Sequence, residues 1–257
     1  AQAKGEAPYH IVTPAMHLSK EDIAALFHER FDTHPDATPE ELTGYVRGVL
    51  RQQFAAADIG ITGANFILAD TGSIVLVENE GNARLTTTLP KVHIAIAGIE
   101  KMLPSIQHLD VFLPLLATFG TGQPMTVYNT VLSGPRQTDE VDGPEAMYVI
   151  LLDNGRSHLA GDAEVREVLH CIRCGSCLTH CPVYQTVGGH TYGSPYSGPI
   201  GAVLSPHLHI EGDFEGNVHL SQASSLCGSC TQNCPVNIPL HHLLLTNRAY
   251  EEEAGLR

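Results

Sequence analysis

The seven cysteines of this chain are the residues whose type and spacing point most directly to chemistry. All of them lie between positions 171 and 234 of a 257-residue sequence. An odd number of cysteines, clustered in this way, is unsuited to a disulfide framework and favours metal chemistry. They form two motifs, and every cysteine of the chain belongs to one of them.

The first motif is a run of four cysteines followed by proline, namely Cys171, Cys174, Cys177, Cys181 and Pro182. The spacing C-x2-C-x2-C-x3-C-P ligates [4Fe–4S] clusters in bacterial ferredoxins. Three thiolates from one tight turn can bind three corners of a cubane, and the fourth, displaced onto a helix, points to a neighbouring cluster. Pro182 lacks an N–H and is expected to end the motif by turning the chain away.

The second motif contains only three cysteines, Cys227, Cys230 and Cys234, and it also ends in proline, Pro235. Superposed on the first motif, they are its second, third and fourth members. The first member would fall at Ser224, which is not a cysteine. The second motif therefore supplies one thiolate fewer than the first.

The spacing also predicts how the cysteines are shared between two clusters. In two-cluster ferredoxins the fourth cysteine of each motif ligates the other cluster. On that basis the first cluster is held by Cys171, Cys174, Cys177 and Cys234. The second cluster is held by Cys181, Cys227 and Cys230, and it is one cysteine ligand short.

The missing corner of the second cluster has several possible ligands. It can be filled by Ser224 as an alkoxide, by a histidine such as His219 or His190, or by water. Alternatively the corner iron is absent and the centre is [3Fe–4S]. We favour a [4Fe–4S] centre with a labile or non-cysteine corner.

Zinc is the competing interpretation, because CxxC pairs in cytosolic proteins commonly mark tetrahedral zinc sites. Zinc needs four ligands per site, and it calls for neither a third cysteine three residues on nor a fourth directly before proline. Most of the fifteen histidines, including His207 and His209 between the motifs, are expected to be surface or hydrogen-bonded structural residues. One near the second cluster would act as a ligand or proton partner.

The composition excludes several other classes of function. Lys plus Arg number 14 against 28 Asp plus Glu, and the resulting net charge of −14 argues against binding to nucleic acid or an anionic membrane. No apolar run approaches the ~20 residues of a membrane span, and no phosphate loop, dinucleotide fingerprint or nucleophile elbow is present. The chain begins at Ala1 without a secretory leader, so a cytoplasmic protein, present here as a processed or partial chain, is expected.

The elements that position the cysteines are predicted from capping and periodicity. Ser19 and Thr38 precede two amphipathic helices, the second with Pro39 at its first position. A β-hairpin is predicted at 65–70 and 73–78 around Thr71-Gly72. Further strands are expected at 92–97, 126–132 and 147–152, a helical stretch at 99–116, and a connector at 155–161.

A change of character after Gly161 separates two predicted domains. Residues 1–158 have the interleaved strands and helices of an α/β layer architecture. Residues 159–257 are expected to form a mostly α-helical domain held together by its inorganic contents. In it, a short helix leads into the first motif, a Gly/Pro/His-rich stretch at 188–206 separates the motifs, and a final helix begins at Leu240.

Two polar stretches of the first domain are weaker candidates for chemistry. The stretch 77–88 holds Glu78 and Glu80 among amides and hydroxyls, and it either lines an anion pocket or is a polar loop with local capping. The stretch 133–139 holds Arg136, a possible carboxylate partner.

Several stretches in combination resemble one known family across nearly the whole chain. They are 63–90, 133–135, 171–182, 188–193, 199–202, 224–227 and 238–241. Together they resemble the iron–sulfur subunit of the lactate-utilisation system. The resemblance implies a partial LUD-type α/β domain, related to the CoA-transferase-like fold, followed by a two-cluster ferredoxin module.

The same resemblance implies a role and partners. Such proteins act with two companion subunits in oxidising L-lactate to pyruvate, lack the eighth cysteine, and are described as carrying two [4Fe–4S] clusters. The resemblance also implies that this chain is shorter than the family at both ends. We therefore expect an electron-transfer subunit of an oxidoreductase, with a redox acceptor and no catalytic residues assigned. The alternatives are an α/β domain that is itself catalytic on an acyl or carboxylate substrate through Glu78 or Glu80, and an iron–sulfur redox sensor.

Overall fold

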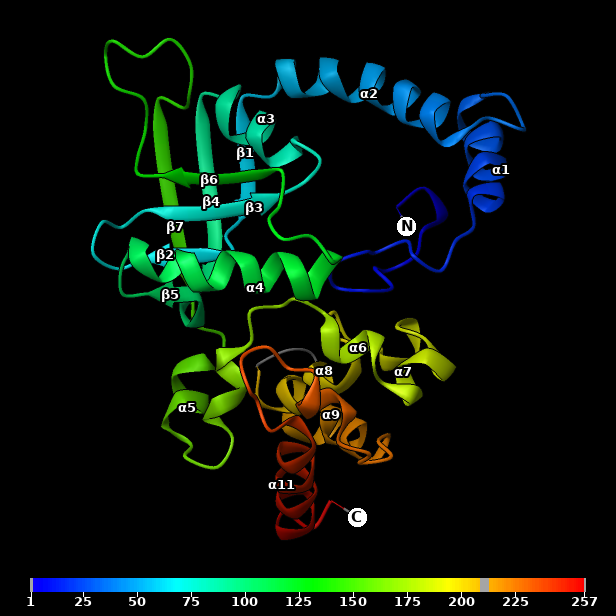
Figure 1. Ribbon diagram of the computed structural model, residues 1–257, viewed down its shortest axis with the longest axis vertical. Coiled ribbons are helices and arrows are strands. Elements are labelled where there is room, and N and C mark those ends of the chain that lie inside the picture. The colour runs from blue at the N-terminus through cyan, green and yellow to red at the C-terminus, as the bar shows by residue number, and fades with distance from the viewer. Residues whose placement is uncertain (1, 209–212, 257) are drawn as a thin grey trace.

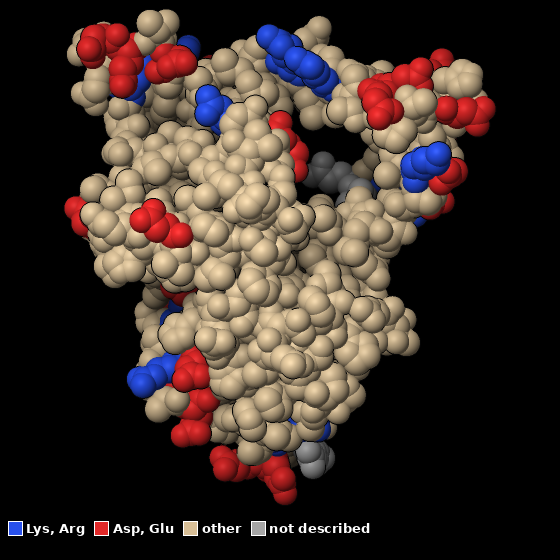
Figure 2. All heavy atoms as spheres, in the orientation of Figure 1, with Lys and Arg blue, Asp and Glu red and all other residues tan. Residues whose placement is uncertain are grey.

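The computed structural model describes residues 2–208 and 213–256, which form an α/β region followed by a helical region (Figure 1). His209, named above between the cysteine motifs, lies outside the described residues. Figure 2 shows acidic side chains gathered at the upper corners and the lower end of one face, whose middle is mainly uncharged. In the described part of the chain, no helix has the length and apolar character needed to cross a membrane.

The two predicted N-terminal helices are confirmed. They are α1 (Lys20–Phe31) and α2 (Pro39–Ala56), and each begins with a capping box. In α1 the Ser19 hydroxyl accepts the backbone N–H of Asp22 at 3.1 Å, and the Asp22 carboxylate accepts the N–H of Ser19 at 2.9 Å. These bonds satisfy donors at the helix start that have no partner within the helix.

The strands form two sheets. A parallel sheet has the order β1 (Ile59–Gly63), β4 (Val92–Gly98), β7 (Ala146–Leu152). A mixed sheet has the order β5 (Met102–Leu103), β2 (Phe66–Leu68), β3 (Ile74–Glu78), β6 (Tyr128–Leu132). The predicted hairpin is confirmed as the antiparallel pair β2–β3. Strand β1 was not predicted, because its sequence Ile-Gly-Ile-Thr-Gly has too few apolar residues to stand out.

The prediction of one helical stretch over 99–116 is wrong in its first half. The structure has η2 (Ile99–Lys101), strand β5 and η3 (Ile106–His108) before α4 (Leu109–Thr121) begins. Strand β5 pairs with β2, and the carbonyl of Leu103 accepts the N–H of Ala69 at 2.8 Å. Pro104 follows at once, and the residue before a proline is biased away from helical geometry. Pairing with the sheet therefore prevails over helical periodicity here.

The connector predicted at 155–161 is instead a short helix, α5 (Arg156–Gly161). Gly155 precedes it with a φ of 84°, and the Asp153 carboxylate accepts the N–H of Ser157 at 2.6 Å. Helix α3 (Asn82–Thr88) was also not predicted as a helix. Both helices are only one or two turns long and depend on side-chain caps, which periodicity does not detect.

The helical region is built around α8 (Gly198–Leu204), all of whose residues are buried. This helix lies within the Gly/Pro/His-rich stretch predicted to separate the motifs. The elements before it are η4 (Arg166–His170), α6 (Ser176–Thr179), α7 (Pro182–Val187) and η5 (His190–Tyr192). Those after it are η6 (Ser205–His207), α9 (Asp213–Asn217), η7 (Val218–Gln222), α10 (Ser229–Gln232) and the predicted final helix α11 (Leu240–Glu253).

The two regions share one hydrophobic cluster. Phe66 and Leu103 of the mixed sheet and Leu109 of α4 are packed in one group with Ile172 and Cys174 of the first cysteine motif. The first motif is therefore anchored to the α/β region as well as to the helical region. The predicted boundary between residues 158 and 159 stays a prediction.

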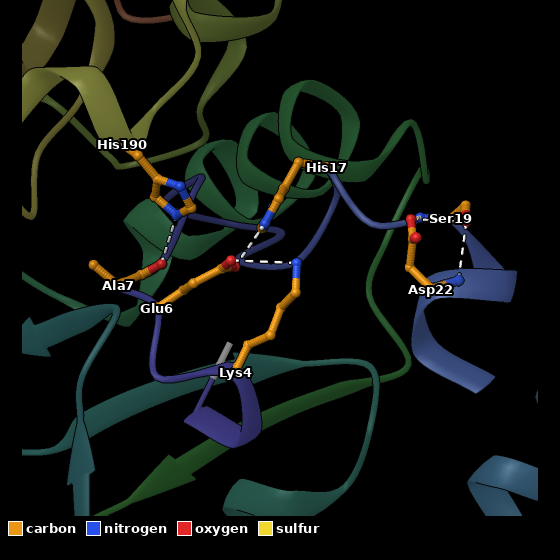
Figure 3. A network of polar contacts seen from close by, with 7 residues as sticks. All are labelled: Lys4, Glu6, Ala7, His17, Ser19, Asp22 and His190. Carbon is orange, nitrogen blue, oxygen red and sulfur yellow. Dashed lines mark hydrogen bonds and ion pairs between the residues drawn. The ribbon is translucent and has the colours of Figure 1, made fainter. Parts of the chain in front are cut away.

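The segment before α1 adds a second connection, because it lies against the helical region (Figure 3). The Tyr184 hydroxyl donates to the Tyr9 carbonyl at 2.7 Å, and a Cβ at Gly189 would lie within covalent distance of that carbonyl. Nearby, the His190 ring bonds the Ala7 carbonyl through Nε2 at 2.8 Å. Glycine is thus required at position 189 by the close approach of the two backbones.

Candidate metal centre

All seven cysteines are free thiols, and both motifs lie in the helical region. Cys174, Cys177 and Cys230 are buried, and Cys227 is exposed. The remaining three, Cys171, Cys181 and Cys234, are partly buried. Helices α6 and α10, which carry the central cysteine of each motif, contact one another, so the motifs distant in sequence are adjacent in space.

The two motifs have the same backbone fold. Each contains the sequence Cys-Gly-Ser-Cys, with a φ of 80° at Gly175 and 79° at Gly228. Each glycine is followed by a four-residue helix, α6 in the first motif and α10 in the second. Arg173 and Leu226, which precede the Cys-Gly-Ser-Cys sequences, have left-handed φ values of 64° and 53°. Left-handed backbone is unfavourable for such side chains and persists where the surrounding structure requires it.

A first group of thiols is linked by the effects of their charges on one another, and it consists of Cys171, Cys174, Cys177 and Cys234. Burial, together with the charges of Cys171 and Cys234, raises the pKa of Cys174 to about 11. Burial likewise raises the pKa of Cys177 far above its ordinary value, with Cys171 and Cys174 contributing. A bound metal centre would supply positive charge to these thiolates and so favour their deprotonated forms.

The other three thiols form a second group. Burial raises the pKa of Cys230, and the charges of Cys181 and Cys227 add to that effect. Cys227 differs, because it is exposed and its pKa is lowered by a backbone hydrogen bond from Ser229. The charge of Cys230 also raises the pKa of Cys177, which belongs to the first group. The two groups therefore adjoin at these two cysteines.

Backbone N–H groups point at the sulfur atoms of both motifs. Three such donor–sulfur pairs are Arg173 to Cys171 at 3.4 Å, Tyr184 to Cys181 at 3.5 Å and Ile238 to Cys234 at 3.4 Å. Such bonds stabilise negative charge on sulfur and help to set the reduction potential of an iron–sulfur cluster. Cys181 is also the N-cap of α7, and Pro182 begins that helix at its first turn. The chain thus turns at Pro182 directly into a helix.

A buried charge network lies beside the first motif, and sequence reasoning missed it. Glu100, whose side chain is 3% exposed, contacts Arg156 at 2.6 Å and Arg173 at 3.2 Å. The Arg173 guanidinium also lies over the ring of Tyr196, 4.6 Å from its centre. The sequence signal was an arginine placed between Cys171 and Cys174 of the first motif.

The candidates for the fourth ligand of the second cluster lie in different places. Ser224 is partly buried, and its hydroxyl accepts the N–H of Leu226 at 3.2 Å. His219 is exposed on η7. His190 lies beside Glu6 and His17, within 4.8 Å by their ligand-type atoms. Figure 3 shows the side chains of His17, His190 and Lys4 near the Glu6 carboxylate. This carboxylate contacts His17 at 3.0 Å and Lys4 at 3.3 Å.

The polar residues of the α/β region are engaged in local contacts. The Glu78 carboxylate accepts the N–H groups of Ala83 and Arg84, at 2.7 and 2.8 Å, and so caps α3. Both Glu78 and Glu80 border a cavity of about 680 Å³ that Arg173 also lines. Arg136 has its carboxylate partner within the chain, because it contacts Glu145 at 2.9 Å on the surface.

Comparison with known proteins agrees with the two regions. The LUD domain family matches residues 6–152, and a 4Fe-4S dicluster domain matches residues 167–238. Relatives named "Lactate utilization protein B" are 52% identical in Bacillus pumilus and 51% in Bacillus subtilis, each over 95% of this chain and 50% of the relative. The relative of that name in Anoxybacillus flavithermus is 50% identical over 95% of this chain and 51% of its own length.

The chain thus spans about half the length of the curated relatives it matches. A solved structure of a DUF162 family protein from Deinococcus radiodurans covers 39% of this chain and 56% of its own, with 21% identity and a TM-score of 0.29. The family match covers more than half of the chain, and the identities to the curated relatives lie far above chance resemblance. The chain belongs to the LUD domain family and continues after that domain into a 4Fe-4S dicluster domain.

Proposed function

We propose that this chain is the iron–sulfur electron-transfer part of a complex that oxidises L-lactate to pyruvate. One cluster is held by Cys171, Cys174, Cys177 and Cys234, and the other by Cys181, Cys227 and Cys230. The observation that supports this assignment best is the arrangement of the thiols into two adjoining groups. Each group contains the fourth cysteine of the other motif, as in two-cluster ferredoxins.

The spacing of the cysteines along the sequence favours iron–sulfur clusters over zinc. A tetrahedral zinc site with Zn–S bonds of ~2.3 Å brings its sulfurs to within ~3.8 Å of one another. Among the described residues, the group whose ligand-type atoms lie within 4.8 Å is Glu6, His17 and His190, and it contains no cysteine. The run of cysteines that ends in proline favours a cubane instead, in which each thiolate binds a different iron atom.

Two adjoining clusters suit the proposed reaction. Oxidation of a 2-hydroxy acid releases two electrons, whereas an iron–sulfur cluster of this type passes one at a time. The neighbouring Cys177 and Cys230 bring the two groups together. The exposed Cys227 places the second group at the surface, where an electron partner can approach it.

The residues around the thiols would bind and tune the clusters. Backbone N–H groups at Cys171, Cys181 and Cys234 stabilise negative charge on the ligands. The Arg173 guanidinium beside Cys171 places a fixed positive charge at the first cluster, and Glu100 holds it there. When bound, the clusters supply the one-electron redox chemistry that the protein side chains lack.

The further assignments belong to the same proposal. We assign residues 1–158 to a LUD-type domain and 159–257 to the dicluster ferredoxin domain. The partners are companion lactate-utilisation subunits and a redox acceptor, and the setting is cytoplasmic. The name "Lactate utilization protein B" of the relatives supports this role. The use of the Glu78 carboxylate as a helix cap supports a conducting rather than a catalytic α/β region.

Turnover assays test this function. The reconstituted chain alone is expected not to oxidise lactate with an artificial acceptor, and to do so when the companion subunits are added. Cys230→Ala should abolish turnover of the assembled complex, whereas Glu80→Gln should leave it intact. Lactate oxidation by the isolated chain, or loss of turnover in Glu80→Gln, would contradict a purely conductive role.

A further inference from the structure

The second cysteine motif repeats the backbone hydrogen bonds and left-handed residues of the first, and this repeat extends to the position of the missing cysteine. In the first motif the sulfur of Cys171 accepts the N–H of the residue two positions on, Arg173, at 3.4 Å. In the second motif the hydroxyl oxygen of Ser224 accepts the N–H of Leu226, also two positions on, at 3.2 Å. The serine oxygen thus occupies the place in its turn that a ligand sulfur occupies in the other.

The following turn is equivalent as well. Gly175 and Gly228 each accept the N–H of the residue three positions on, at 2.9 and 3.1 Å. The fourth cysteines, Cys181 and Cys234, each donate their N–H to the carbonyl three positions earlier, and both distances are 3.2 Å. Leu226, two positions after Ser224, has a left-handed φ of 53°, as Arg173, two positions after Cys171, has one of 64°.

The segment that carries Ser224 is held in place by α11. Arg248 donates through Nε to the Ser221 carbonyl at 2.9 Å and through Nη2 to the Ser224 carbonyl at 3.1 Å. These bonds fix the backbone on both sides of the serine. They also place a guanidinium charge next to it, and a nearby positive charge favours the deprotonated form of an oxygen ligand.

We propose that the oxygen of Ser224 is the fourth protein ligand of the second cluster, completing the set of Cys181, Cys227 and Cys230. The inference rests on the proposed iron–sulfur function. As the Fe–O bond forms, the hydroxyl proton passes to solvent, as the thiol protons of the cysteines do, and no atom changes oxidation state. The bond leaves an oxygen lone pair to keep the hydrogen bond from Leu226.

An oxygen ligand gives the second cluster a distinct character. Alkoxide oxygen is a harder ligand than thiolate and stabilises the more oxidised iron. The second cluster should therefore have a lower reduction potential than an all-cysteine version of the same site. The corner iron that Ser224 binds is also held less firmly than the other three, because soft thiolates suit iron–sulfur clusters best.

Three substitutions in the reconstituted full chain test the proposal under anaerobic conditions. Ser224→Ala is expected to lose one iron atom per chain and to gain the EPR signal of an oxidised [3Fe–4S] cluster. Ser224→Cys should keep the wild-type iron content and raise the potential of the second cluster. Ser225→Ala, which removes the adjacent hydroxyl that bonds Cys227 but leaves Ser224 in place, is the matched control and should keep the wild-type iron content. Unchanged iron and EPR spectra in Ser224→Ala would overturn the proposal.

The wild-type chain provides a second test that does not depend on the folding of a variant. In H2¹⁷O, a water ligand on the corner iron would broaden the EPR signal of the second cluster, and we expect no broadening. Broadening, or a [3Fe–4S] signal in freshly reconstituted wild type, would overturn Ser224 ligation while leaving the electron-transfer function standing. A wild-type chain with no iron would overturn both.

Discussion

Replacing Glu100 with glutamine removes the carboxylate that lies between two guanidinium groups at the junction of the α/β region and the first cysteine motif. The Glu100 side chain is 3% exposed, and the side chains of Arg156 and Arg173 are 5% and 15% exposed. A neutral amide of the same size would leave both cations without their charge partner in a site that water hardly reaches. Removing one member of a buried ion pair costs about 3–5 kcal/mol.

We therefore expect Glu100→Gln to lower the free energy of unfolding by about 3–5 kcal/mol. The matched control is Glu145→Gln, which removes the partner of Arg136 from a surface pair of 2.9 Å whose side chains are 57% and 37% exposed. That substitution should cost about 0–1 kcal/mol. Urea unfolding of the reconstituted chain, followed anaerobically by circular dichroism, gives both values.

Equal losses in the two variants would refute the reasoning, because they would show that burial at Glu100 does not strengthen its contacts. A double variant of Glu100→Gln with Arg173→Gln refines the test. If Glu100 acts partly through Arg173, the losses in the two single variants should sum to more than the loss in the double variant.

Three further predictions follow from the same geometry. Arg173→Gln should lower the reduction potential of the first cluster by tens of millivolts, because the positive guanidinium favours the added electron. A tenfold change in the equilibrium corresponds to about 59 mV. A redox titration showing no change or a rise would contradict this prediction. Gly198→Ala should destabilise the helical region, because Gly198 has a φ of 68° and a Cβ there would lie 2.6 Å from Leu178 Cγ. An unchanged urea midpoint would contradict this prediction, since it would show that the contact relaxes without cost. Burial lowers the pKa of His10 and His93 from the ordinary value of 6.5. As the pH drops through about 6.5 the unfolded chain therefore binds protons on these histidines before the folded chain does, and the free energy of unfolding should fall. His93→Gln should weaken this pH dependence, and an equally steep fall in that variant would contradict the assignment.

The sequence was sufficient where local chemistry determines local structure. The capping boxes at Ser19 and Thr38 start helices at the expected residues, and the cysteine spacing identifies a domain of the 4Fe-4S dicluster type. In these cases the residues that carry the signal are close in sequence, so spacing alone contains the information.

The sequence was insufficient where contacts distant along the chain decide the outcome. Met102 and Leu103 become a strand because β2 is available to pair with them, not because of their neighbours. The partnership of Glu100 with Arg173 joins residues of separate regions, and neither residue signals it locally. The spacing of the two motifs already aligned Ser224 with Cys171. Only the structure shows that both side chains accept the N–H of the residue two positions on.

The central claim is that the seven cysteines hold two iron–sulfur clusters, and metal analysis combined with EPR tests it most directly. The chain, reconstituted and handled anaerobically, should contain about eight iron atoms and about eight acid-labile sulfides for its dicluster domain. On reduction it should show EPR signals of two magnetically interacting [4Fe–4S] centres, because the two groups of thiols adjoin. Bound zinc without labile sulfide, or the signal of a single isolated cluster, would contradict the account.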